Sequence, residues 1–135
     1  IKEISYIHSE AYSSGSLKHG PFALLDKSFP VIILDITDTH RSKNENAIHE
    51  IASRDAPIYC ITDKKPVRVN NNVNHANSSN NCNNDHINYI YLNKNKTYGE
   101  LLSIIPLQYI SYYLAINRGI NPDYPKNLAK VVTVE

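Results

Sequence analysis

A continuous apolar run, Val31-Ile-Ile-Leu-Asp-Ile36, constrains the fold of this chain more than any other segment. It lacks the alternation of apolar and polar residues that a strand with one solvated face shows. Such a run is typical of a strand that is buried on both faces, as in a parallel sheet covered by helices. Two similar runs follow at residues 57–62 and 87–92, and we expect them to form the second and third strands.

A helical pattern precedes the first predicted strand. Apolar residues recur at helical spacing over residues 1–13, and Gly15 is expected to end that helix. Gly20 and Pro21 then open a short second helix, because proline is favoured at the first helical position.

Two further helices are expected after the first strand, at residues 43–54 and 97–118. Gly119 should end the longer one, and Pro106 should kink it or mark its true start. Its apolar side carries Leu101, Ile105, Tyr109, Tyr112 and Ile116. Strands that alternate with helices predict an α/β fold with parallel strands, in which ligands bind outside the carboxyl ends of the strands.

Asparagine dominates residues 70–84, between the second and third predicted strands. A segment with so little to bury should be a disordered surface loop, and we place it within an insertion at residues 63–86. His75, Cys82 and His86 occur in and around it, but their spacing matches no standard zinc site, so no metal is expected.

The composition narrows the class of protein. The 135 residues carry a formal net charge of +1, which gives no reason to expect a nucleic-acid partner. No apolar run approaches the length of a membrane span. Two cysteines do not make a disulfide framework, and Cys60 is expected to be buried, so a cytoplasmic location is expected. The chain contains no methionine and starts at Ile1, which indicates a fragment of a longer protein.

The C-terminal tail is unusually apolar. Pro122 and Pro125 restrict its start, and the sequence Leu-Ala-Lys-Val-Val-Thr-Val follows. Such a tail should pack against protein and carry Lys130 with it. Lys130 then either extends to solvent from a tail docked only for stability, or serves in a partly dry place as an amine nucleophile.

Two other side chains are candidates for acid–base chemistry. His19 precedes Gly20-Pro21, so a neutral imidazole at a helix N-terminus could exchange protons, or the histidine could simply help the helix begin. Glu3 and Glu10 lie on the first predicted helix, and the residues alone do not separate a functional carboxylate from a surface one.

Three motifs add a family resemblance. Asn127-Leu-Ala-Lys130, followed by Val-Thr-Val-Glu, resembles the C-terminal end of the glutamine–fructose-6-phosphate aminotransferase (isomerizing) family. Residues 2–12, continued by Leu17-Lys-His-Gly-Pro21, resemble the same family at the expected distance upstream. Pro106-Leu-Gln108 fits its last long helix, whereas residues 63–86 are unmatched.

The resemblance implies a fold and an activity. Residues 1–118 would form part of a flavodoxin-like sugar isomerase (SIS) subdomain, truncated at its N-terminal side, and residues 119–135 an active-site tail. The family converts fructose 6-phosphate and glutamine-derived ammonia to glucosamine 6-phosphate, which leads to UDP-N-acetylglucosamine. The implied partners are a first SIS subdomain, an N-terminal glutaminase domain and further copies in a homodimer or tetramer. No cofactor is implied.

The resemblance also assigns roles to site residues. Glu3 aligns with the carboxylate that moves a proton between sugar carbons C1 and C2, and His19 with the ring-opening histidine that a neighbouring subunit contributes. Lys130 aligns with the lysine that forms a Schiff base with the ketose, and Ala129 with a substrate-binding position. Lys126 stands where many members have arginine.

Two departures from the family pattern limit what the chain can do alone. The chain begins after another functional lysine of the family, and the family's phosphate clamp lies in the other subdomain. The isolated 135 residues are therefore expected to be inactive. The alternative is a non-catalytic, regulatory SIS-type module that binds a sugar phosphate.

Overall fold

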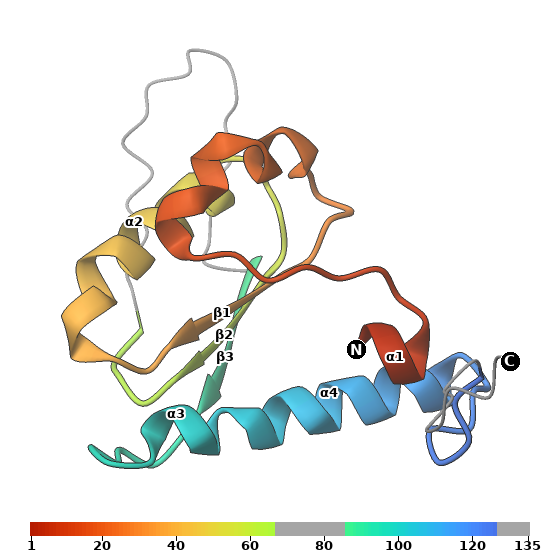
Figure 1. The fold of residues 1–135 in the computed structure, drawn as a ribbon. Coiled ribbons are helices and arrows are strands. Elements are labelled where there is room, and N and C mark those ends of the chain that lie inside the picture. Colours follow the sequence, from red (N-terminus) through yellow and green to blue (C-terminus); the bar gives the residue numbers. More distant parts are fainter. Residues whose placement is uncertain (67–85, 127–135) are drawn as a thin grey trace, which may run out of the picture. The chain divides into compact units, whose positions relative to one another are not determined.

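The computed structural model describes residues 1–66 and 86–126, and the chain packs as two compact units (Figure 1). Residues 12–103 form one, which we name the sheet unit. Residues 1–11 join the chain from Ile104 onward in the other, which we name the helical unit.

Three parallel strands form the centre of the sheet unit. β1 (Val31–Asp35), β2 (Ile58–Thr62) and β3 (Ile87–Tyr91) lie in the order β1-β2-β3. The register places Ile33 beside Cys60 and Cys60 beside Tyr89. The three predicted strands and the α/β class are confirmed.

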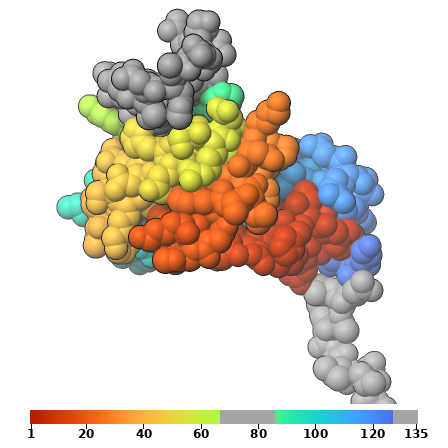
Figure 2. Space-filling model, turned by 90° about the horizontal axis from the view of Figure 1, so that it is seen from above, coloured from red at the N-terminus to blue at the C-terminus, as the bar shows by residue number. Residues whose placement is uncertain are grey.

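Helical segments cover one face of this sheet. They are η1 (Ser14–His19), η2 (Pro21–Leu24) and α2 (Arg41–Ala52), with the short η3 (Asp38–His40) before α2. Residues 12–30 and α2 lie side by side in Figure 2, and η1 contacts α2. The buried core between these segments and the sheet consists of Ile33, Ile48, Ile51, Ala56, Ile58 and Cys60.

The other face of the sheet is less covered. Leu34 of β1 is 44% exposed and Tyr59 of β2 is 39% exposed, although Ile61 is fully buried. The prediction that the run at residues 31–36 is buried on both faces is therefore wrong for Leu34. Leu17 of η1, Phe22 of η2 and Ile48 of α2 belong to the core that includes Ile33, and the side chain of Leu34 points to the opposite face of the strand.

The helical unit begins with α1 (Lys2–Ser5), which packs against α4 (Ile104–Asn117). The prediction of a helix over residues 1–13 is wrong. Tyr6 adopts a left-handed backbone conformation with φ 54° and ends α1, while its N–H donates to the carbonyl of Lys2. Apolar spacing alone predicted a longer helix because it carries no information on tertiary contacts of Tyr6.

The long helix predicted at residues 97–118 is interrupted. α3 (Gly99–Leu102) ends before Ser103, and α4 starts at Ile104. Pro106 lies in the first turn of α4, where backbone N–H groups have no partner within the helix, so the proline costs no hydrogen bond there. Pro106 thus marks the start of α4, which was one of the two expected alternatives.

Gly119 ends α4 as expected, with a φ of 68°. Its N–H donates to the carbonyl of Ile116, and the N–H of Ile120 donates to that of Ala115, both at 2.9 Å. These are the two hydrogen bonds of a Schellman motif, which requires a left-handed residue and therefore favours glycine.

The predicted apolar side of the long helix is exposed. Ser111 and Ala115, one turn apart, are the buried residues of α4. The side expected to be buried carries Leu101, Ile105, Tyr109, Tyr112 and Ile116, all more than 40% exposed. Apolar residues surround α4, so periodicity could not identify its buried face. In the described parts of the chain, no helix has both the length and the apolar character needed to cross a membrane.

Gly99 offers a test of the packing between α3 and the end of β1. A Cβ at Gly99 would lie 2.9 Å from Cγ2 of Ile36, whereas a Cβ at Gly15 would have no heavy atom within 4 Å. Overpacking costs about 1–3 kcal/mol, of which a helical alanine recovers up to about 1 kcal/mol. Gly99→Ala should lower the free energy of unfolding in urea by about 1 kcal/mol, and Gly15→Ala should not lower it. Equal effects would contradict the close contact.

Candidate functional site

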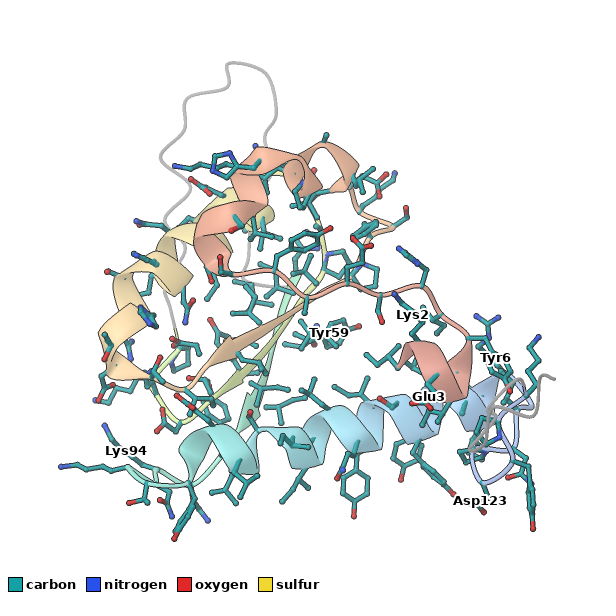
Figure 3. All side chains as sticks on the ribbon, in the orientation of Figure 1. Lys2, Glu3, Tyr6, Tyr59, Lys94 and Asp123 are labelled. Atoms are coloured by element: carbon teal, nitrogen blue, oxygen red, sulfur yellow. The ribbon has the colours of Figure 1, made fainter. Side chains whose placement is uncertain are left out.

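Glu3 lies on α1 with its carboxylate exposed. Ser5, two residues later, is fully buried and its hydroxyl donates to the carbonyl of Ile1 at 2.7 Å. The buried side of α1 is thereby fixed, and Glu3 stands outside it. Figure 3 labels Glu3 and Tyr6 on this short segment.

Tyr6 connects α1 to the root of the C-terminal tail. Its hydroxyl accepts a hydrogen bond from the backbone N–H of Lys126 at 2.6 Å. The ammonium nitrogen of Lys126 lies 4.5 Å from the centroid of the Tyr6 ring, a cation–π distance. The two residues are 120 positions apart in the sequence. The sequence alone predicts neither of these two contacts between Tyr6 and Lys126.

The chain between α4 and Lys126 is braced by local hydrogen bonds. The side-chain oxygen of Asn121 accepts from the N–H of Asp123 at 3.0 Å, which is an Asx-turn. Pro122 and Pro125 fix two further φ angles. The route from Gly119 to Lys126 is therefore well defined.

His19 is the last residue of η1, in the sheet unit. Leu17 and Phe22 on either side of it pack against the core, so the intervening residues turn outward and His19 is exposed. Gly20 makes the turn with a φ of 139°, and Pro21 starts η2 as predicted. η2 has only four residues and is a 3₁₀ helix, so the expected dipole effect on His19 is small.

The structure does not determine how the four predicted site residues lie relative to one another. Glu3 and His19 lie in different units. Lys130 and Ala129 lie outside the described residues, as do His75 and Cys82. The roles of Glu3, His19, Ala129 and Lys130 stay predictions.

A buried polar cluster lies at the carboxyl ends of β1 and β2. The ammonium of Lys64 donates to the backbone carbonyl of Asp35 at 3.2 Å and lies 3.5 Å from its carboxylate. Asp38 and Asp63 carboxylate oxygens lie 3.7 and 3.9 Å away. The Lys64 side chain is only 4% exposed. This lysine neutralises a group of carboxylates and is closed off from solvent.

Two neutral side chains complete the cluster around Asp35. Asn44 of α2 donates to its carboxylate at 3.1 Å, and the hydroxyl of Thr62 donates to its backbone carbonyl at 2.9 Å. Ser14 in turn donates to the side-chain oxygen of Asn44 at 2.6 Å. The cluster therefore joins β1, β2, α2 and the start of η1. A sequence signal existed: Asp35 and Thr62 lie at or near the carboxyl ends of two predicted strands, and these ends meet in a parallel sheet.

Cys60 is a buried, free thiol, as expected. Burial, and to a lesser extent the nearby Asp35 carboxylate, raises the pKa of Cys60 to about 12. The thiol is therefore protonated at neutral pH, and Cys60 packs as a small apolar side chain rather than acting as a nucleophile.

The model of the SIS domain matches residues 1–118. The chain belongs to the SIS domain family. The Francisella tularensis structure titled as the C-terminal domain of glucosamine-fructose-6-phosphate aminotransferase is similar, with a TM-score of 0.75 and 32% identity. That similarity covers 91% of this chain and 31% of the solved chain.

Relatives match the whole chain. It is 50% identical over 135 residues to an Acanthamoeba polyphaga mimivirus protein named a probable glutamine–fructose-6-phosphate aminotransferase (isomerizing). It is 40% identical over 136 residues to the Clostridium tetani aminotransferase of that name. The match covers 100% of this chain in both cases. The chain spans 20% of the length of each relative.

The Lys64 cluster gives a stability prediction. Asp35→Asn keeps the side-chain shape but removes the carboxylate nearest to the buried ammonium. Breaking a buried ion pair costs about 3–5 kcal/mol, and we expect the lower value because Asp38 and Asp63 remain. Glu100→Gln, at an exposed position of α3, is the matched control and should change the free energy of unfolding in urea by less than about 0.5 kcal/mol. A similarly small effect of Asp35→Asn would show that the pair does not stabilise the fold.

Proposed function

We propose that this chain is part of the isomerase half of a glutamine–fructose-6-phosphate aminotransferase and acts within the longer protein, in the cytoplasm. The observation that carries the proposal is the match of the whole chain to relatives with this name. The chain accounts for a fifth of their length, so the substrate clamp and the ammonia source would belong to other parts of the protein.

The proposed reaction begins with the closed ring of fructose 6-phosphate. A closed ketose has no free carbonyl, so a proton must leave the anomeric hydroxyl and reach the ring oxygen. His19 would transfer this proton, supplied by a neighbouring subunit. The support for this role is the exposed position of His19 between two residues that are anchored in the core.

Lys130 would then condense with the C2 carbonyl and release water, which gives an imine. An imine is a better electron sink than a ketone. Ammonia adds at C2, the lysine amine leaves, and the sugar keeps a C2 imine. Ala129 would help to bind the sugar beside Lys130.

Glu3 would complete the conversion. Its carboxylate takes a proton from C1 and returns one to C2, while the C1 hydroxyl gives up its proton and the imine nitrogen gains one. The C2 imine thereby becomes a 2-amino aldehyde that closes to glucosamine 6-phosphate. A single base must reach both carbons, which suits one carboxylate on a fixed helix. The overall reaction consumes fructose 6-phosphate and ammonia and produces glucosamine 6-phosphate and water, with no cofactor required by these steps.

The first test separates Glu3 from Lys130. In the full-length protein, Glu3→Gln should lower kcat by roughly 10²–10⁴-fold because general acid–base catalysis contributes that much. Borohydride reduction with fructose 6-phosphate should still label Lys130 in this variant, and Lys130→Ala should abolish the label. Glu10→Gln is the matched control and should retain activity. A sugar on another lysine would overturn the assignment of Lys130, and full activity of Lys130→Ala would favour the regulatory sugar-phosphate-binding module.

The second test concerns the subunit that supplies His19. His19→Ala and Lys130→Ala should each be inactive alone. If His19 acts across subunits, mixed dimers contain one site that has both an intact Lys130 and an intact His19. Unfolding and refolding the two variants together should therefore restore a measurable fraction of the aminotransferase rate. No recovery, in mixtures shown to contain heterodimers, would place His19 and Lys130 of one site on the same subunit.

A further inference from the structure

We propose that Tyr6 is a positioning residue for Lys130, because it fixes the root of the C-terminal tail to the helix that carries Glu3. This inference rests on the proposed function, and it concerns two residues, Tyr6 and Lys126, to which neither the motifs nor the comparisons give a role.

The first observation is that Tyr6 holds Lys126 at two points. The phenol oxygen accepts the backbone N–H of Lys126 at 2.6 Å, and the aromatic ring lies 4.5 Å from the ammonium nitrogen of the same residue. One contact fixes the main chain and the other fixes the side chain. Lys126 is thus limited in both position and orientation, which a single exposed hydrogen bond would not achieve.

The second observation is the backbone of Tyr6. It has φ 54° and ψ 27°, a conformation that costs free energy for a residue with a Cβ. Asparagine or glycine would be the usual choice there. A tyrosine at this position indicates that its side chain contributes something that offsets the strain, and that side chain contacts Lys126 through both its hydroxyl and its ring.

The third observation is the place of Lys126 in the chain. The Schellman motif at Gly119 and the Asx-turn at Asn121 define the route to it from α4, and α4 itself packs against α1. Figure 3 shows Tyr6, directly after α1, beside the segment that contains Asp123. Lys126 is therefore the last residue of a braced segment, and Tyr6 fastens its end.

Lys130 follows Lys126 by four positions. Four residues span at most about 14 Å even when fully extended. Lys130 is therefore separated by only a short stretch of chain from a residue that is fixed next to α1. If Tyr6 released Lys126, the last anchored residue of the tail would lie farther from Lys130 in the sequence.

The proposed chemistry explains why this limit matters. Lys130 would react at C2 of the sugar, and Glu3 would move a proton between C1 and C2, so both groups must meet adjacent atoms of one substrate. Catalytic groups must be held close to their productive geometry, and a misplacement of 1 Å can be costly in rate. The role proposed for Tyr6 acts through Lys126 and involves no contact with the sugar, so its effect should be on kcat and not on the KM for fructose 6-phosphate.

Tyr6→Phe in the full-length protein is the decisive variant, because it keeps the ring and removes only the acceptor for Lys126 N–H. We expect kcat to fall roughly fivefold to tenfold, the effect of one lost hydrogen bond, with KM within about twofold of wild type. Tyr6→Leu, which also removes the ring, should lower kcat further. Tyr124→Phe, at a tyrosine of the same unit that is 82% exposed, is the matched control.

Lys126 variants test the second contact. Lys126→Met removes the charge and should lower kcat, whereas Lys126→Arg keeps a cation for the Tyr6 ring and should restore it. Recovery with arginine would separate positioning from a general loss of structure, because both substitutions change the length and shape of the side chain.

Hydrogen–deuterium exchange without substrate gives a readout that does not depend on activity. Tyr6→Phe should speed exchange at the Lys126 amide and in peptides from residues 127–135, while Tyr124→Phe should not. Unchanged exchange, or faster exchange with an unchanged kcat, would overturn the positioning role. Loss of imine trapping at Lys130 in the wild-type protein would instead overturn the proposed function, so the two failures are distinguishable.

Discussion

The parallel pairing of β2 with both β1 and β3 is the constraint on which the sheet unit depends. Its register sets side chains in rows across the strands, such as Ile33 beside Cys60, and Asp35 beside Thr62. The first row lies in the core. The second lies at the carboxyl edge and is polar. A shift of one residue would turn these side chains to the opposite face, so the core and the polar edge are set by the same hydrogen-bond ladder.

The polar edge has a consequence for where a substrate can bind. Ligands of open α/β sheets usually bind outside the carboxyl ends of the strands. Between β1 and β2 of this chain, the ammonium of Lys64 already occupies that place and is nearly excluded from solvent. The described strand ends thus offer a stabilising ion-pair cluster, and the predicted site residues come from α1, η1 and the tail instead.

Local sequence patterns predicted the strands well, because short apolar runs bounded by turn residues form few structures other than buried strands in a domain of this size. They failed where a distant contact decides the outcome. α1 ends at Tyr6, whose side chain meets Lys126 at the other end of the chain. Lys64 is buried only because β2 brings it to Asp35. The candidate site shows the same limit. The residues alone did not decide whether Glu3 or Glu10 is the functional carboxylate, and the family resemblance favoured Glu3.

The division into two units suits the order of the proposed steps. Glu3 and Lys130 would act on adjacent carbons of one intermediate, so both would benefit from attachment to the same unit, and the proposed anchoring of Lys126 by Tyr6 would provide it. Ring opening by His19 would be complete before the imine forms. A histidine for that step can therefore stand on a different unit, or on another subunit, without disturbing the geometry at C1 and C2. A contact between residues far apart in the sequence, such as that of Tyr6 with Lys126, is needed only for groups that act on adjacent substrate atoms at the same time, as Glu3 and Lys130 would.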